Sequence, residues 1–148
     1  MIQWAVVGVY VGAMFLLASQ EASSASYTRH ILAKWFPHLT NAEMRQMVLL
    51  MRKSGHVLAY GVLTLVVYLA ARKTKKVRRF ALPLAALCAS LTAVADESYQ
   101  SYLHYRTGAV QDVLIDGIGI GAMVLVLWLV ARRRSRQNEE VAEENVEN

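Results

Sequence analysis

The chain has 148 residues, of which 55% are hydrophobic and 18% charged. The hydrophobic residues lie in long unbroken stretches, which excludes an ordinary soluble domain with helical or alternating stripes and predicts a membrane protein. The formal net charge is +5. Most Lys and Arg residues lie in two short blocks beside these stretches, so the charge indicates membrane topology and no nucleic-acid partner.

The first apolar stretch, residues 2–18, contains no charged residue. A cleaved signal peptide is the alternative, since small residues follow, but no Lys or Arg precedes the stretch and it is long for the hydrophobic part of a signal. We therefore predict a retained membrane span. Gly8 and Gly12 form a G-x-x-x-G pair, which predicts the close approach of another helix.

Residues 21–51 form the longest connection between apolar stretches. Apolar residues at helical spacing predict a short interfacial helix that ends at Pro37. These residues are Tyr27, Ile31, Leu32, Trp35 and Phe36. Thr40 and Glu43 then form a capping-box pattern, which predicts a further helix running close to, or directly into, the next span.

The second span is predicted at residues 54–71 and the third at residues 80–95. Between them, six of the eight residues 72–79 are Lys or Arg. Ala85, Ala89 and Ala93 repeat at every fourth position of the third span, which predicts a smooth packing face.

The fourth span is predicted at residues 110–131, where Gly117 and Gly121 form a second close-packing pair. Four Arg residues within 132–136 end this span, and the acidic, polar residues 137–148 predict a disordered tail. The predicted fold is therefore all-α. It is an integral membrane four-helix bundle over residues 1–136, with a short interfacial helix between the first two spans.

The basic residues predict the orientation of this bundle. Ten Lys and Arg residues lie in the 72–79 loop and just after the fourth span, whereas six are spread over the two longer connections. By the positive-inside rule, the dense blocks are cytoplasmic. Both termini are then inside the cell, the tail is cytoplasmic, and segments 21–53 and 96–109 face outward.

The remaining charged residues gather at the outward ends of three spans. They are Arg52, Lys53 and His56, then Asp96, Glu97 and Gln100, then Arg106, and finally Asp112 and Asp116. Within each group the residues recur three or four positions apart, with Tyr60 following His56, so each group shares one helix face. An ionised carboxylate at membrane depth is unfavourable by several kcal/mol without partners. We therefore predict a polar funnel in the outer leaflet, lined by alternating charges.

Two interpretations of this cluster are open. It could be an ion network that fixes the ends of three helices, as buried charges sometimes do. It could instead be a site for a polar head group. The second interpretation is favoured because four carboxylates, three permanent cations and a histidine exceed what packing requires.

These residues resemble a known family, the VanZ-like membrane proteins, which are named for an accessory protein of teicoplanin resistance in Gram-positive bacteria. Residues 15–20 read FLLASQ, residues 52–60 read RKSGHVLAY and residues 96–100 read DESYQ. Arg106, Asp112 and Asp116 follow, and the first glycine of the last family motif falls at Gly117 or Gly119. Ala18 replaces the first serine of a Ser-Ser-Gln motif. The resemblance implies a bacterial cell-envelope setting and, in some members, lowered susceptibility to such antibiotics; it implies no particular reaction.

One hypothesis is an enzyme that acts on a lipid-linked anionic head group. The cations Arg52, Lys53 and Arg106 would hold a phosphate or carboxylate, and His56 would act as general base or nucleophile, oriented by Asp96 or Asp116. Glu97 or Asp112 would be the second acid or base. The candidate substrate-binding set also includes Gln20, Tyr60 and Gln100. Taken by itself, Tyr60 is expected to be a packing residue with a satisfied hydroxyl more than a catalytic acid.

Further hypotheses use the same cluster without chemistry. The chain could bind or transport a membrane lipid, a lipid-linked cell-wall precursor or a glycopeptide, and a transporter of so few helices would have to be a homo-oligomer packed through its glycine faces. It could also be an assembly partner for another membrane protein. No residue spacing demands a metal, although hard oxygen ligands could hold a divalent cation. Whether the protein is an enzyme therefore stays open at this point.

Overall fold

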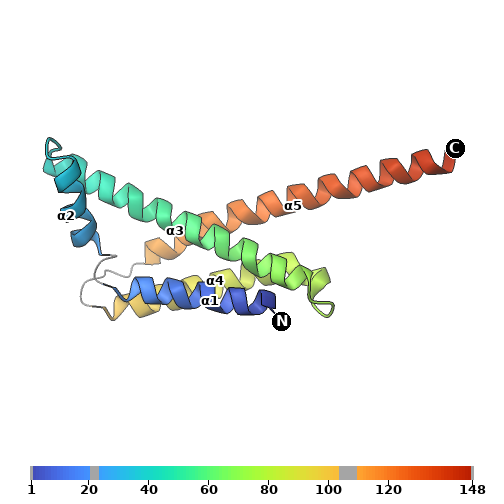
Figure 1. Ribbon diagram of the computed structural model, residues 1–148, viewed down its shortest axis with the longest axis horizontal. Coiled ribbons are helices and arrows are strands. Elements are labelled where there is room, and N and C mark those ends of the chain that lie inside the picture. The colour runs from blue at the N-terminus through green and yellow to red at the C-terminus, as the bar shows by residue number, and fades with distance from the viewer. Residues whose placement is uncertain (1, 21–23, 104–109, 148) are drawn as a thin grey trace.

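The computed structural model describes residues 2–20, 24–103 and 110–147, and within these ranges the chain is helical and contains no β-strand. The α-helices occur in chain order as α1 (Ile2–Ala18), α2 (Ala25–Trp35), α3 (Asn41–Arg72), α4 (Ala81–Ser101) and α5 (Val110–Glu147). A short 3-10 turn, η2 (Arg78–Phe80), precedes α4. Figure 1 shows α1 and α4 side by side, with α3 crossing α5 above them. The all-α prediction is confirmed for the described residues.

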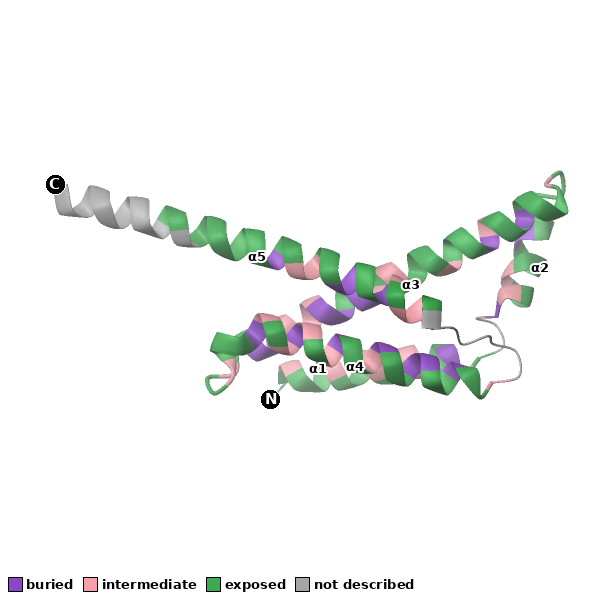
Figure 2. Ribbon diagram, turned by 180° about the vertical axis from the view of Figure 1, so that it is seen from behind, coloured by how far each residue is buried: buried purple, intermediate pink, exposed green. Residues whose placement is uncertain are grey.

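Three of the helices are long and apolar enough to cross a membrane: Asn41–Arg72, Arg78–Ser101 and Gln111–Arg134. α1 is also apolar but shorter, with 17 residues. Their outer faces carry large exposed side chains such as Leu58, Leu91 and Leu114, each more than 60% exposed. Figure 2 shows these exposed faces along the length of the helices. Exposed apolar surface on this scale is suited to lipid and not to water.

The described part of the connection between the first two apolar stretches forms the two helices predicted there. Ser24 caps α2 by accepting a hydrogen bond from the backbone N–H of Tyr27. At the start of α3, Thr40 Oγ1 accepts from the Glu43 N–H at 3.3 Å, and Glu43 Oε2 accepts from the Thr40 N–H at 2.8 Å. The capping box is therefore confirmed, and α2 packs on α3 through a small apolar cluster built around Leu32.

α3 is one uninterrupted helix, so the helix that begins at the capping box runs directly into the second predicted span. Its 32 residues extend about 48 Å at ~1.5 Å per residue, which exceeds a hydrocarbon core of about 30 Å. The excess lies at its N-terminal end, where α2 packs. α2 and the start of α3 thus form a unit at one end of the bundle.

The core lies where α3 and α4 face each other. Ala85, Ala89 and Ala93 of α4 are fully buried against Tyr60, Leu63 and Val67 of α3, which confirms the predicted alanine packing face. α1 covers this pair through partly buried residues, and its Tyr10 hydroxyl donates to the Ala59 carbonyl at 3.0 Å. The small alanine side chains let two long helices approach closely over several turns.

The predicted glycine pairs pack against no described residue of the chain, whereas a different glycine, Gly119, does. A Cβ added at Gly8, Gly12, Gly117 or Gly121 would have no described atom within 4 Å. A Cβ at Gly119 would instead clash with the backbone of Val57 in α3. The close approach of another helix to these two pairs stays a prediction, because spacing along a helix does not reveal which face meets a neighbour or whether that neighbour belongs to the same chain. The contact between α3 and α5 rests on Gly119.

The structure also differs from the sequence prediction at the C-terminus. The backbone of α5 continues as a helix to Glu147, whereas we predicted disorder from residue 137 onward. Residues 137–147 are rich in Glu, which favours the helix, and they extend a helix that is already nucleated by the span. The boundary at residue 136 between membrane domain and tail stays a prediction.

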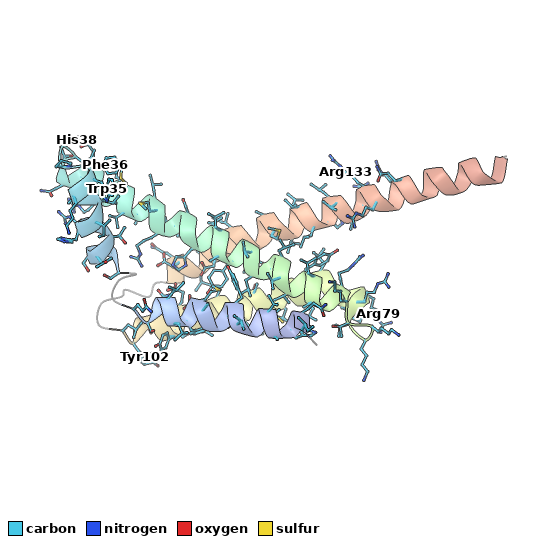
Figure 3. All side chains as sticks on the ribbon, in the orientation of Figure 1. Trp35, Phe36, His38, Arg79, Tyr102 and Arg133 are labelled. Carbon is cyan, nitrogen blue, oxygen red and sulfur yellow. The ribbon has the colours of Figure 1, made fainter. Side chains whose placement is uncertain are left out.

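Both basic blocks lie at the same end of the bundle. A pocket of about 680 Å³ brings Arg72 and Arg78 together with Arg134 of α5, and Trp4 Nε1 of α1 donates to Thr74 Oγ1 in the same region at 2.9 Å. Figure 3 shows Arg79 and Arg133 toward one end of the long axis and Trp35, Phe36 and His38 at the other. The chain therefore has a basic end and an opposite end that carries α2.

Candidate functional site

Polar side chains from three helices meet inside the bundle, near the C-terminal end of α4 and the first turns of α5. These side chains, named here the polar cluster, are His56, Tyr60, Asp96, Glu97, Gln100 and Asp116. Asp96, Glu97, Gln100 and Asp116 are all buried. Polar groups buried in an apolar bundle are unfavourable unless they are paired, so their contacts define what this region can do.

His56 and Asp116 form the central pair of the polar cluster. His56 Nδ1 lies 2.8 Å from Asp116 Oδ1, and the Asp116 side chain is fully buried while that of His56 is 16% exposed. The second carboxylate oxygen of Asp116, Oδ2, is buried without a hydrogen-bond partner among the described residues. The sequence left open whether Asp96 or Asp116 orients His56, and the geometry selects Asp116.

Asp96 has a different partner. Its Oδ2 accepts a hydrogen bond of 3.0 Å from the hydroxyl of Tyr60, which is 1% exposed. Tyr60 is therefore buried with a satisfied hydroxyl, as expected of a packing residue, while its place in the substrate-binding set stays a prediction. The Tyr60 ring also stacks on the His56 ring, with centroids 6.4 Å apart and planes inclined by 22°. Tyr60 thus links the Asp96 carboxylate to the His56 side of the polar cluster.

Glu97 brings a third carboxylate to the same place. A ligand atom of Glu97 lies within 4.8 Å of ligand atoms of both His56 and Asp116, which are themselves in contact. The three side chains come from α4, α3 and α5, so they are adjacent only in the folded chain. One imidazole nitrogen and two carboxylates at this spacing could hold a metal ion or share protons.

Two pockets meet at His56. The first, here the α1 pocket, has a volume of about 150 Å³ and is closed on one side by Met14, Leu17 and Ala18 of α1. Its polar wall consists of His56, Tyr60, Asp96 and Gln100. The second, here the α3–α5 pocket, has a volume of about 190 Å³. Its charged lining residues are Arg52, Lys53, His56 and Asp112. His56 therefore stands between a largely apolar pocket and one that carries two permanent cations.

Most of the predicted site residues lie in this region. The polar cluster contains six of them, and Arg52, Lys53 and Asp112 line the α3–α5 pocket. Gln20 is exposed just beyond the end of α1 and lines neither pocket. Arg106 lies outside the described residues, so its predicted role as a phosphate-binding cation stays a prediction.

The sequence missed the contribution of α1. Met14, Leu17 and Ala18 are uncharged and belong to an apolar stretch with no chemical motif, yet they form one wall of the α1 pocket. A weak signal existed, because Leu17 and Ala18 lie within residues 15–20, which already resembled a family motif. That motif is explained by its position beside the polar cluster and not by any charge of its own.

An all-helical bundle with several membrane-length apolar helices and an internal polar site indicates a helical membrane protein. The family model VanZ/LLP1 matches residues 4–131, which covers all four apolar stretches and the whole polar cluster. The chain therefore belongs to the VanZ/LLP1 family, and the resemblance noted from its motifs is confirmed. No curated protein and no solved structure matches the chain.

Proposed function

We propose that the chain is a four-span protein of the bacterial cytoplasmic membrane with both termini in the cytoplasm. The 17 apolar residues of α1 extend about 26 Å at ~1.5 Å per residue, which is close to the thickness of a hydrocarbon core. The two basic blocks share one end of the bundle, as cytoplasmic loops do under the positive-inside rule. α2 would then lie at the outer surface as an interfacial helix, and the polar cluster would open outward.

Cysteine labelling in intact cells tests this orientation. In a Cys88→Ala background the chain has no other cysteine. Trp35→Cys on α2, where the native residue is 76% exposed, is expected to react with a membrane-impermeant maleimide, whereas Lys75→Cys in the basic loop is expected to react only after the cells are opened. The reverse pattern would contradict the proposed orientation without affecting the fold.

The function that the site supports best is recognition of an anionic head group on a membrane lipid or lipid-linked cell-wall precursor. The observation that carries this proposal is the α3–α5 pocket, where Arg52 and Lys53 adjoin the His56–Asp116 pair. Guanidinium and ammonium groups bind phosphate or carboxylate through charge-assisted hydrogen bonds. Arg52 also lines a larger pocket of about 430 Å³ between α2 and α3, which could accommodate the rest of an amphiphilic molecule.

Binding of a polyprenyl phosphate to the purified chain in nanodiscs tests the recognition step. Arg52→Ala and Lys53→Ala are each expected to weaken binding by about 10-fold or more, because a hydrogen bond to a charged group contributes ~1.5–3 kcal/mol. Lys34→Ala, which removes an exposed cation from the neighbouring helix α2, is the matched control and should change affinity little. Equal weakening by all three variants would indicate nonspecific attraction and would contradict a specific site.

The same geometry supports hydrolase or transferase chemistry on the bound head group. With Asp116 accepting from Nδ1–H, the other ring nitrogen of His56 is free to take a proton from water or a hydroxyl as that oxygen attacks. Glu97 stands near enough to serve as a second acid or base. Non-catalytic binding, transport or assembly by the same residues is the alternative, and it predicts ligand retention without conversion. The family resemblance links either activity to teicoplanin resistance.

A further inference from the structure

We propose that His56, Glu97 and Asp116 form a binding site for a divalent transition-metal ion of the Zn²⁺ class. These side chains converge from α3, α4 and α5, and one ligand atom of each lies within 4.8 Å of the other two. One imidazole nitrogen and two carboxylate oxygens form a mixed donor set that suits Zn²⁺ better than Mg²⁺ or Ca²⁺, which prefer oxygen ligands alone.

The distances are close to those of a coordination sphere. Ligands about 2.0–2.2 Å from one zinc ion are roughly 3–3.5 Å from each other in tetrahedral geometry. His56 Nδ1 and Asp116 Oδ1 are already 2.8 Å apart, and the 4.8 Å limit for the remaining contacts leaves a contraction of about 1–2 Å. A contraction of this size is within the range of side-chain rotation and needs no movement of a helix.

The charge balance of the polar cluster favours a cation. Among residues 2–20, 24–103 and 110–134, the buried charged side chains are Asp96, Glu97 and Asp116, all of them acids. A carboxylate buried at membrane depth is unfavourable unless it is paired. A divalent ion beside His56 would offset the charge of Asp116, whose side chain is fully buried. It would also give Asp116 Oδ2 a partner, since that fully buried atom has none among the described residues.

Asp96 is not in the proposed ligand set, because the side chains whose ligand atoms converge within 4.8 Å are those of His56, Glu97 and Asp116. Asp96 has a separate contact. Its Oδ2 accepts the Tyr60 hydroxyl, and Tyr60 stacks on the His56 ring. Asp96 and Tyr60 would thus lie beside the ion-binding side chains without supplying a ligand. Three protein ligands would leave a coordination position open, as in catalytic zinc sites.

The proposed ion would bind His56, which the proposed function also uses, but ion binding requires no head group. A bound ion would replace the hydrogen bond between His56 Nδ1 and Asp116, and head-group recognition would stay with Arg52 and Lys53. The competing explanation is that the carboxylates are neutralised by protons, or by a cation from outside the described residues. Under that explanation the purified chain has no stoichiometric metal affinity.

Calorimetric titration of chelator-stripped protein in detergent with Zn²⁺ tests the inference, with no lipid added. We expect one ion per chain, with affinity lowered about 10-fold or more in His56→Ala and in Glu97→Gln, since even the outer contacts of metal sites contribute 10–100-fold. His30→Ala is the matched control: it also removes an imidazole, but this histidine is exposed on α2 and lines neither pocket. It should bind Zn²⁺ as the unmodified chain does.

A second measurement does not depend on the folding of any variant. Co²⁺ added to the unmodified chain should give the visible absorption of a cobalt ion with a nitrogen ligand, and Zn²⁺ should abolish it by displacement. Absence of a stoichiometric Zn²⁺ isotherm and of the cobalt signal would overturn the inference, as would equal affinity in all three variants. Polyprenyl phosphate binding that stays sensitive to Arg52→Ala in chelator would then leave the proposed function intact.

Discussion

Replacing Gly119 by alanine is expected to destabilise the folded chain by about 2–3 kcal/mol or more, although alanine is the better helix former. The added methyl group would occupy the position of the Val57 backbone carbonyl, where α3 and α5 cross. A flexible side chain could move aside, but backbone in the middle of a 32-residue helix can relieve the clash only if the two helices separate. Thermal unfolding of the purified chain in detergent measures the effect.

Gly121 provides a control in the same helix. A Cβ there has no described atom within 4 Å, so Gly121→Ala should be neutral or stabilise the chain by up to ~1 kcal/mol through helix propensity. If both variants behave alike, the close crossing of α3 and α5 is wrong. If Gly121→Ala alone destabilises the protein, its face is covered in a homo-oligomer, as the G-x-x-x-G spacing first suggested.

The second large effect is expected at His56. If His56 is a general base, His56→Ala should lower conversion of a lipid-linked substrate by about 10²–10⁴-fold. Its contact with the buried Asp116 and its place between two pockets single it out from His30 and His38, the other described histidines. Product formation from a lipid-linked precursor and the protection of a teicoplanin-sensitive host are the two readouts.

His30→Ala is the matched control for that substitution. His30 is exposed on α2 and lines neither pocket, so its removal should leave both readouts unchanged. Lost conversion with retained polyprenyl phosphate binding in His56→Ala would support catalysis. Binding and protection that fall together, with no conversion in the unmodified chain, would support a binding module. Full activity in His56→Ala combined with Glu97→Gln would rule out the enzyme hypothesis.

The sequence could not predict which side chains of the polar cluster pair with each other. Spacing of three and four residues placed His56 and Tyr60 on one face of α3, and Asp112 and Asp116 on one face of α5, which the helices bear out. Spacing could not distinguish Asp96 from Asp116 as the partner of His56. That choice depends on the rotation of α4 and α5 about their axes relative to α3, which no local pattern encodes.

The sequence by itself determined the features that depend on neighbours along the chain. Apolar stretches fixed the positions of the helices, Thr40 and Glu43 fixed the start of α3, and the alanine repeat identified the buried face of α4. Short-range hydrogen bonding and burial periodicity are enough for these features.

Only the tertiary structure decided which distant residues meet. It placed Gly119, and neither Gly117 nor Gly121, at the crossing of α3 and α5, and it brought an uncharged wall of α1 beside the polar cluster. It also joined Glu97 to His56 and Asp116. Each outcome follows from how whole helices rotate and cross to pack without voids, a property of the assembled bundle and not of any one segment.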